Sequence, residues 1–179
     1  MVDNAALLDA LRRGSIAGAA LDVWEGEPAI SMELLERAAL GTPHIAGYSF
    51  DGKVNGTEMI YRAACLFLEV EPTWRAAEQM PASPLPILEL NAGGKSAQDI
   101  VAEAVRKVYP IERDDAALRE MLSLAPDQRH AHFDRLRKEY PVRREFFNTT
   151  VKLEGRAPEA ARAIAMLSGI GFKALPAGD

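Results

Sequence analysis

The chain has 179 residues, of which 48% are hydrophobic and 26% are charged, and its net charge is −5 at pH 7. This composition argues for a folded protein of one or two domains and against both disorder and nucleic-acid binding. The single cysteine, Cys65, cannot form an internal disulfide, which fits a reducing compartment. The sequence has no apolar run near the roughly 20 residues of a membrane span and no signal-peptide pattern, so we expect a cytoplasmic protein without membrane contact.

The first elements of the chain are predicted to be a helix, a short turn and a buried strand. Asp3 is a suitable N-cap for a helix over Ala5–Arg13, and Gly14 can end that helix. Ala17–Val23 is almost continuously apolar, which predicts a strand buried on both faces. Helix, turn and strand form the unit of a parallel α/β sheet, but one unit cannot form a sheet. We therefore expect this region to be part of a larger sheet.

A second helix and strand are predicted directly afterwards. Ser31 is placed to cap a short helix over Met32–Ala39. Thr42–Ala46 has the character of a short strand, and Pro43 within it cannot donate a ladder hydrogen bond, which favours an edge position. Gly47 follows, and a glycine there allows the backbone to approach a ligand closely.

Three candidate functional side chains lie at these predicted strand ends: Glu27 and His44 are candidates for catalysis, and Asp22 is a candidate for facing a ligand. Open α/β sheets bind ligands at the carboxyl ends of their strands. Histidine can accept the proton of an alcohol because its ordinary pKa is about 6.5, and a carboxylate on its second ring nitrogen fixes the tautomer. Glu27 and His44 form such a pair if the intervening helix returns the chain to the same sheet edge. The alternative is a structural histidine and a loop carboxylate.

Two motifs in this stretch are more specific than the spacing of single residues. LDVWEGEP at 21–28 and TPHIAGYSFDGKVNGTEMIY at 42–61 resemble the C-terminal part of the D-2-hydroxyacid dehydrogenases, and within them the 4-phosphoerythronate dehydrogenases of vitamin B6 biosynthesis. The resemblance begins at residues 2–4 and continues, more weakly, to about Leu175. It implies an α/β fold in which the C-terminal part of a Rossmann-like NAD-binding domain precedes a small α+β dimerisation domain.

The resemblance also implies roles for five residues. His44 would exchange the proton of the substrate hydroxyl, and Glu27 would be its acid partner. Asp22 and Gly47 would line the NAD site, and Tyr48 would contact the substrate. The implied reaction is hydride transfer from the C2 carbinol of a phosphorylated 2-hydroxy acid to NAD, in a homodimer. The family's catalytic arginine and glycine-rich phosphate loop are absent from this sequence, which bears on the activity of the chain by itself.

The chain then divides at a proline-rich segment. After a predicted turn at Asp51–Gly52, a helix is expected from Val54 or Thr57 to about Val70. Its predicted apolar face consists of Ile60, Ala63, Ala64 and Phe67. Four prolines between residues 71 and 86 make regular structure improbable there, so we predict a linker. The predicted division is residues 1–70 for the NAD-binding and catalytic part, 71–86 for the linker and 87–179 for the dimerisation domain.

The last part of the chain is predicted to alternate strands with helices. The expected strands are Ile87–Leu90, Phe146–Leu153 and Phe172–Leu175, and the expected helices run from Ser96 to about Tyr109, from Asp114 to Leu122, over Asp127–Tyr140 and over Pro158–Ser168. Ser96, with Asp99 three residues later, fits a capping box. A sheet of three strands has edges that a two-fold partner can cover, which agrees with the implied homodimer.

Other motifs in this part have simpler interpretations. The loop Asn91–Ser96 resembles a phosphate loop, but the first glycine of that motif would be residue 89, which is Glu89. His130 and His132 lie two apart on a predicted helix and cannot face one metal ion together. A basic stretch is most simply a solvated face, although some of its members could reach a partner's acidic surface or a phosphorylated substrate. The stretch consists of Arg129, Arg135, Arg137, Lys138, Arg143 and Arg144.

Two alternative functions remain open at this point. The chain could belong to a D-2-hydroxyacid dehydrogenase with a different substrate, or it could be a non-catalytic dimerisation fragment. A panel of 2-hydroxy acids with and without a terminal phosphate separates the first alternative from the main hypothesis. No binding of NAD by a well-formed dimer would favour the second.

Overall fold

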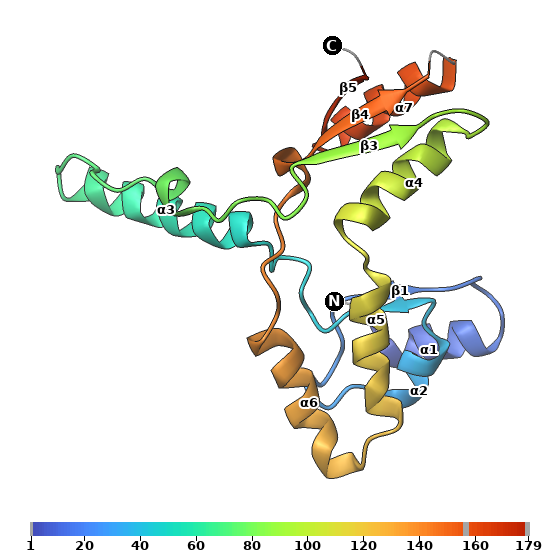
Figure 1. The fold of residues 1–179 in the computed structure, drawn as a ribbon. Helices are drawn as coiled ribbons and strands as arrows, with labels where there is room; N and C mark the ends of the chain where they lie inside the picture. The colour runs from blue at the N-terminus through green and yellow to red at the C-terminus, as the bar shows by residue number, and fades with distance from the viewer. Residues whose placement is uncertain (1, 156–157, 178–179) are drawn as a thin grey trace. The chain divides into compact units, whose positions relative to one another are not determined.

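The computed structural model describes residues 2–155 and 158–177, and the chain forms two compact units. Unit 1 comprises Met1–Tyr48 with Ile111–Pro141, and unit 2 comprises Ser49–Pro110 with Val142–Asp179. Figure 1 labels their main helices and strands. No helix in the described ranges combines the length and apolar character needed to cross a bilayer.

Unit 1 is mostly helical. Its elements are α1 (Asn4–Arg12), β1 (Ala20–Leu21), α2 (Met32–Arg37), β2 (Leu40–Gly41), α5 (Glu112–Arg119), the 3-10 helix η2 (Glu120–Leu122) and α6 (Pro126–Lys138). The two predicted N-caps are confirmed: Asp3 accepts a hydrogen bond from the Ala6 amide, and Ser31 accepts one from the Leu34 amide. The first two helices therefore begin where the local sequence places them.

The strands of unit 1 are much shorter than predicted. β1 and β2 are parallel and pair Ala20 with Leu40 and Leu21 with Gly41. The prediction of a buried strand over Ala17–Val23 is wrong, because among the described residues β1 has a neighbour on one side only. The predicted strand over Thr42–Ala46 is also wrong. The Thr42 amide still donates to the Leu21 carbonyl of β1. The pairing ends there, because the Ile45 and Ala46 amides donate to the Asp22 side chain.

Helix α5 completes unit 1 by binding the end of α2 and the start of β2. Arg119 donates to the carbonyls of Leu35 and Ala38 at 2.8 and 2.7 Å, and Asp115 accepts from the Gly41 amide at 2.7 Å. Apolar residues of both chain segments share one core, which includes Trp24, Leu34, Leu35, Leu118, Met121 and Phe133. Residues 111–141 thus pack against the N-terminal segment, although they lie in the predicted dimerisation domain. The predicted domain division itself remains a prediction.

Unit 2 contains a three-stranded sheet and a long separate helix. Its elements are α3 (Phe50–Phe67), η1 (Ala76–Gln79), β3 (Ile87–Asn91), α4 (Ala97–Val108), η3 (Phe146–Asn148), β4 (Thr150–Glu154), α7 (Pro158–Gly169) and β5 (Lys173–Pro176). The capping box at the start of α4 is confirmed, since Ser96 and Asp99 each bind the other's backbone amide. The segment Phe146–Asn148, predicted as strand, is a 3-10 turn that leads into β4.

The sheet of unit 2 is parallel, in the order β3-β4-β5. Leu88 of β3 pairs with Val151 of β4, which in turn pairs with Ala174 of β5. Alternate residues of β3 and β4 are buried under α4 and α7, which also pack against each other. The mixed α/β character that the sequence predicts is therefore present in unit 2.

Helix α3 differs from its prediction at both its start and its face. Ser49 caps the helix, so Asp51 and Gly52 lie in the first helical turn and do not form a separate turn. The predicted apolar face is not buried in this chain, because Ile60 and Phe67 are 74% and 86% exposed. The main packing partner of α3 is the η1 segment, where Glu58 accepts from the Ala76 amide.

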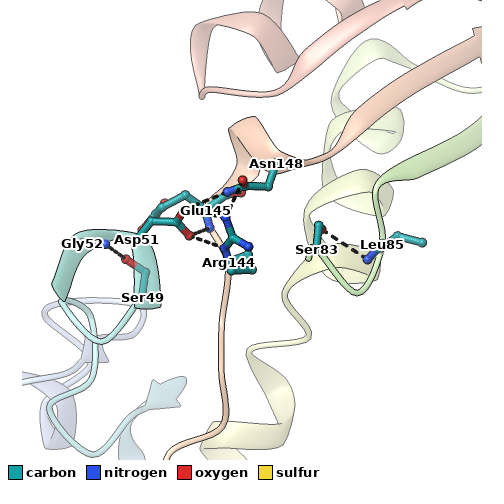
Figure 2. Close-up of polar contacts among 8 residues, drawn as sticks. All are labelled: Ser49, Asp51, Gly52, Ser83, Leu85, Arg144, Glu145 and Asn148. Carbon is teal, nitrogen blue, oxygen red and sulfur yellow. Dashed lines mark hydrogen bonds and ion pairs between the residues drawn. The ribbon is translucent and has the colours of Figure 1, made fainter. Parts of the chain in front are cut away.

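A buried ion pair joins the start of α3 to the segment before β4. Figure 2 shows the Asp51 carboxylate facing Arg144 and Asn148. Asp51 accepts hydrogen bonds from Arg144 Nε at 3.0 Å, Arg144 Nη2 at 3.1 Å, Asn148 Nδ2 at 3.1 Å and the Glu145 amide at 2.8 Å. The side chains of Asp51 and Arg144 are only 2% and 7% exposed. We refer to Asp51, Arg144 and Asn148 as the Asp51 cluster.

Candidate active site

Glu27 and His44, which are 17 residues apart, meet in unit 1. His44 Nδ1 lies 2.7 Å from Glu27 Oε2, which is a short hydrogen bond. The Glu27 side chain is 17% exposed, whereas that of His44 is 43% exposed. No hydrogen bond to His44 Nε2 is found within residues 2–155 and 158–177. One ring nitrogen is therefore oriented by a carboxylate, and the other is left for an external partner.

Trp24 holds Glu27 in place. The Trp24 amide donates to Glu27 Oε1 at 2.7 Å, so both oxygens of the Glu27 carboxylate are engaged. The Trp24 indole is 2% exposed, and its Nε1 donates to the Thr42 carbonyl at 2.9 Å. One buried aromatic residue thus ties the loop of Glu27 to the loop of His44. The sequence analysis missed this role, although a tryptophan inside the WEGEP motif was the available signal.

The backbone of His44 adopts an uncommon conformation. Its φ is +56°, in the left-handed region that non-glycine residues rarely occupy. Its amide donates to the Thr42 carbonyl at 3.0 Å, which closes a tight turn. Such a conformation costs free energy and persists where surrounding contacts impose it. Here the contacts of Glu27 and of the following residues impose it.

Asp22 fixes the loop that carries His44. Its Oδ1 accepts from the Thr42 hydroxyl and from the Ile45 amide, both at 2.7 Å, and its Oδ2 accepts from the Ala46 amide at 3.0 Å. Asp22 thus holds the chain on both sides of His44, through the Thr42 side chain before it and two backbone amides after it. A carboxylate has about four acceptor positions, so these contacts leave capacity for a ligand. The predicted NAD contact of Asp22 remains a prediction.

Gly47 and Tyr48 lie at the end of the same loop. Gly47 is exposed, and a Cβ atom placed on it would meet no atom within 4 Å. Internal packing thus does not require glycine at this position, and the open space suits a ligand. The Tyr48 ring makes an edge contact with Tyr140 at 5.9 Å between centroids, and the guanidinium of Arg137 lies over it at 5.6 Å. The predicted substrate contact of Tyr48 is not tested by these packing contacts.

The five predicted site residues therefore share one loop system. Asp22, Glu27 and His44 are connected by direct hydrogen bonds or through the backbone of the loop, and Gly47 and Tyr48 continue that loop. The contacts of Arg137, in helix α6, and of Tyr140, just after it, with Tyr48 were not predicted, because both residues are distant in the chain and give no local signal. The assigned roles of all five residues remain predictions.

A metal centre is not evident in this region. Within the described ranges, no group of three or more His, Cys, Asp or Glu side chains is placed to bind a metal ion. His132 is 4% exposed, and its ring nitrogens contact the Ala117 carbonyl at 2.8 Å and Arg135 Nη2 at 2.9 Å. These contacts give His132 a structural role in packing α6 against α5.

The matching family models cover both parts of the chain. Residues 80–171, just over half of the chain, match the family described as Domain of unknown function (DUF3410). The chain belongs to this family. Residues 1–46 match the model described as D-isomer specific 2-hydroxyacid dehydrogenase, NAD binding domain. The second match contains Asp22, Glu27 and His44, and the predicted linker lies largely between the two matches.

Curated relatives extend the similarity over nearly all of the chain. An erythronate-4-phosphate dehydrogenase of Pseudomonas putida is 45% identical over 170 residues, which cover 95% of this chain and 44% of the relative. Proteins of the same name from Cellvibrio japonicus and Marinobacter nauticus are 47% and 40% identical, each over 97% of this chain and over 46% and 44% of the relative. The resemblance inferred from the two sequence motifs is thus confirmed. The chain spans less than half the length of these relatives.

Proposed function

We propose that the protein is an NAD-dependent dehydrogenase that oxidises the C2 hydroxyl of D-erythronate 4-phosphate to the 2-oxo acid, as a step of vitamin B6 biosynthesis in the cytoplasm. The observation that carries this proposal is the 2.7 Å contact between His44 Nδ1 and Glu27, which leaves Nε2 for the substrate. The names of the relatives and the NAD-binding-domain match support the choice of reaction and cofactor.

His44 performs the proton transfer in this proposal. Its neutral Nε2 accepts the proton of the C2 hydroxyl while the hydride leaves C2, and the resulting imidazolium carries its charge beside Glu27. Glu27 fixes the tautomer with the proton on Nδ1, because a carboxylate at that distance accepts a hydrogen bond. Trp24 and Asp22 then act as positioning residues, since their hydrogen bonds hold the loops of Glu27 and His44 in place.

NAD, when bound, accepts the hydride. Gly47 and Asp22 are the residues of this chain that would lie by its nicotinamide end. The open space beside the Gly47 Cα atom and the unused acceptor capacity of Asp22 fit that role. Tyr48, at the end of the loop, would contact the substrate. The catalytic arginine of the family, which the resemblance places outside this sequence, would hold the substrate carboxylate.

The proposed partner is a second copy of the chain, bound through residues 87–179. Within the described residues β3 and β5 each pair only with β4, so each leaves one edge unpaired. Unpaired edges favour association unless they are covered, and a two-fold partner can cover them. Mass measurement by light scattering tests this assembly, and a monomer at all concentrations would contradict it.

The activity is tested by following NADH formation with D-erythronate 4-phosphate. The chain is assayed by itself and joined to the part of the Pseudomonas putida relative that it does not match, and NAD binding is measured by calorimetry. We expect turnover in the joined protein and its loss in the His44→Ala variant. A panel of other 2-hydroxy acids provides the control for substrate choice. A folded, NAD-binding joined protein that oxidises none of them would contradict the proposal.

A further inference from the structure

Four arginines of the basic stretch have contacts with other residues of the chain, and a fifth, Arg137, has a donor atom without a partner. Arg129 donates to the Leu124 carbonyl, Arg135 contacts His132, Arg143 lies over the Tyr109 ring, and Arg144 belongs to the Asp51 cluster. Arg137 differs from these four. Its Nε is buried and has no hydrogen-bond partner, and no ion pair to its guanidinium is found among the described residues.

An unsatisfied arginine donor in a partly buried position is unusual. Guanidinium is charged at every physiological pH and has five donors and no acceptor. Burying a donor without an acceptor costs free energy, so native structures rarely keep one without a reason. The contact of its guanidinium with the Tyr48 ring nevertheless holds the side chain in place. What its Nε lacks is a hydrogen-bond acceptor.

Arg137 lies beside the loop that carries His44. Its guanidinium is 5.6 Å from the centroid of the Tyr48 ring, and Tyr140 makes an edge contact with the same ring. The Tyr48 amide donates to the Ile45 carbonyl at 2.9 Å, which joins Tyr48 to the turn of His44. A pocket of about 210 Å³ is lined by Tyr140 and by Pro43, the residue before His44, although not by Arg137 itself. The end of α6 and the candidate catalytic loop therefore pack against each other within unit 1.

We propose that Arg137 binds the terminal phosphate of the substrate while His44 acts on the hydroxyl, an inference that rests on the proposed function. A planar guanidinium binds a phosphate through two parallel hydrogen bonds, and stacking on an aromatic ring orients it. The substrate carries a carboxylate, a C2 hydroxyl and a phosphate at the opposite end. The first two have assigned partners, and Arg137 supplies the third. This contact makes the enzyme select 2-hydroxy acids with a distal phosphate.

The decisive experiment compares phosphorylated and unphosphorylated substrates in three variants of the joined protein. Arg137→Met keeps the aliphatic packing and removes the charge, Arg137→Lys keeps the charge without the planar fork, and Lys138→Met is the matched control on the exposed neighbour. For Arg137→Met we expect kcat/KM to fall about 10- to 100-fold with D-erythronate 4-phosphate and to change less than about threefold with D-erythronate. Arg137→Lys should recover part of the loss, and Lys138→Met should leave both values unchanged. An equal fall with both substrates would overturn the inference, since it would mean that Arg137 only supports the loop.

A second measurement reads binding without turnover. The Nε–Hε resonance of Arg137 in the ¹⁵N-labelled chain is assigned by its disappearance in Arg137→Lys, and it is followed during titration with D-erythronate 4-phosphate, D-erythronate, inorganic phosphate or NAD. We expect a saturable shift with the phosphate ester and none with D-erythronate. A shift with NAD alone would assign Arg137 to the cofactor and overturn the inference, as would a resonance that no ligand moves.

The two tests distinguish failure of this inference from failure of the proposed function. A saturable shift with D-erythronate 4-phosphate in a protein without turnover would leave the phosphate site standing and remove the dehydrogenase. Turnover that still requires the phosphate in Arg137→Met would do the opposite. Circular dichroism of each variant establishes that it is folded, and Arg137→Lys serves as the test if Arg137→Met is not.

Discussion

The Glu27–His44 contact of unit 1 and the Asp51–Arg144 ion pair of unit 2 are built in opposite ways. In unit 2 the Asp51 carboxylate is surrounded by four hydrogen bonds, and both it and Arg144 are almost completely removed from solvent. In unit 1 the Glu27–His44 contact is a single short hydrogen bond, and the His44 side chain is 43% exposed. We call the Asp51–Arg144 pair the closed pair, because its contacts lie within the chain and exclude solvent. We call the Glu27–His44 pair the open pair, because the His44 side chain is partly exposed.

This difference in contacts separates a pair with a structural role from a pair that is suited to catalysis. The acceptor positions of Asp51 are filled by this chain, so the Asp51 cluster can only hold the chain together. Both oxygens of Glu27 are engaged as well, by Trp24 and His44, but the second ring nitrogen of His44 has no hydrogen-bond partner within the described residues. An ion pair whose contacts all lie within the chain needs no role beyond structure, whereas an oriented histidine with one unused nitrogen is suited to acid–base chemistry.

The largest expected effect tests the open pair. His44→Ala in the joined protein removes the proton acceptor, so kcat should fall by about 10²- to 10⁴-fold, the usual range for loss of general acid–base catalysis. NAD affinity, measured by calorimetry, should change little because the histidine contacts the hydroxyl. Near-normal turnover would show that the open pair is as structural as the closed one. Asn148→Ala, which alters only the Asp51 cluster, is the matched control for activity.

The second effect tests the closed pair. Asp51→Asn leaves Arg144 buried without its countercharge, and breaking such a pair typically costs about 3–5 kcal/mol of the free energy of unfolding. Each unit has one tryptophan, Trp24 in unit 1 and Trp74 in unit 2. Fluorine resonances of 5-fluorotryptophan therefore report the two units separately during urea titration. We expect the Trp74 transition to move to lower urea and the Trp24 transition to remain. Movement of Trp24 alone would contradict the assignment of the cluster to unit 2.

The Asp51 pair also makes the stability of unit 2 depend on pH. Burial raises the pKa of Asp51, but hydrogen bonds from Arg144, Glu145 and Asn148 outweigh burial and hold this pKa below its ordinary value of 3.8. Because the folded pKa is depressed, the stabilisation is complete above the unfolded pKa and is lost as pH falls through the folded one. The stability difference between wild type and Asp51→Asn should thus be constant near neutral pH and shrink below about pH 4. A difference that grows on acidification would refute this linkage.

The third effect separates the charge of Glu27 from its position. In Glu27→Gln the amide oxygen can still accept from the Trp24 amide, which turns the NH₂ group toward His44 Nδ1. That contact favours the tautomer with the proton on Nε2, so the base is blocked, and kcat should fall about 10²-fold. Turnover equal to wild type at all pH values would mean that Glu27 does not orient the catalytic tautomer. Glu25→Gln, in the same loop, is the control for a change of charge alone.

Local sequence patterns predicted the helix caps of both units. The features that they missed depend on contacts between residues that are far apart in the chain. The caps at Asp3, Ser31 and Ser96 were predictable because each involves residues no more than three positions apart. The predicted strand over Thr42–Ala46 failed because Asp22, which is 23 and 24 residues away, accepts the hydrogen bonds of the Ile45 and Ala46 amides that a ladder would need. Propensity and hydrophobic pattern carry no information about such a competitor.

In the candidate site, too, local patterns were predictable and long-range contacts were not. The pairing of Glu27 with His44 could be anticipated from the motifs and from the chemistry of a histidine base. The position of Arg137 over Tyr48 could not, because 88 residues separate them in the printed sequence and α6 returns to the loop only through the packing of unit 1. The exposure of Ile60 and Phe67 was missed for a related reason: an apolar stripe predicts that a helix is covered but not by which residues.

The smallest expected effect concerns the backbone of His44 itself. A left-handed φ costs an alanine about 1–2 kcal/mol and glycine almost nothing, while glycine loses up to about 1 kcal/mol through the entropy of the unfolded chain. His44→Gly should therefore be more stable than His44→Ala by up to about 1 kcal/mol in the Trp24 transition, and both variants should lack turnover. No equivalent gain is expected at Asn148, whose φ is not in that region. If His44→Gly were less stable than His44→Ala, the left-handed φ would not strain the backbone at residue 44.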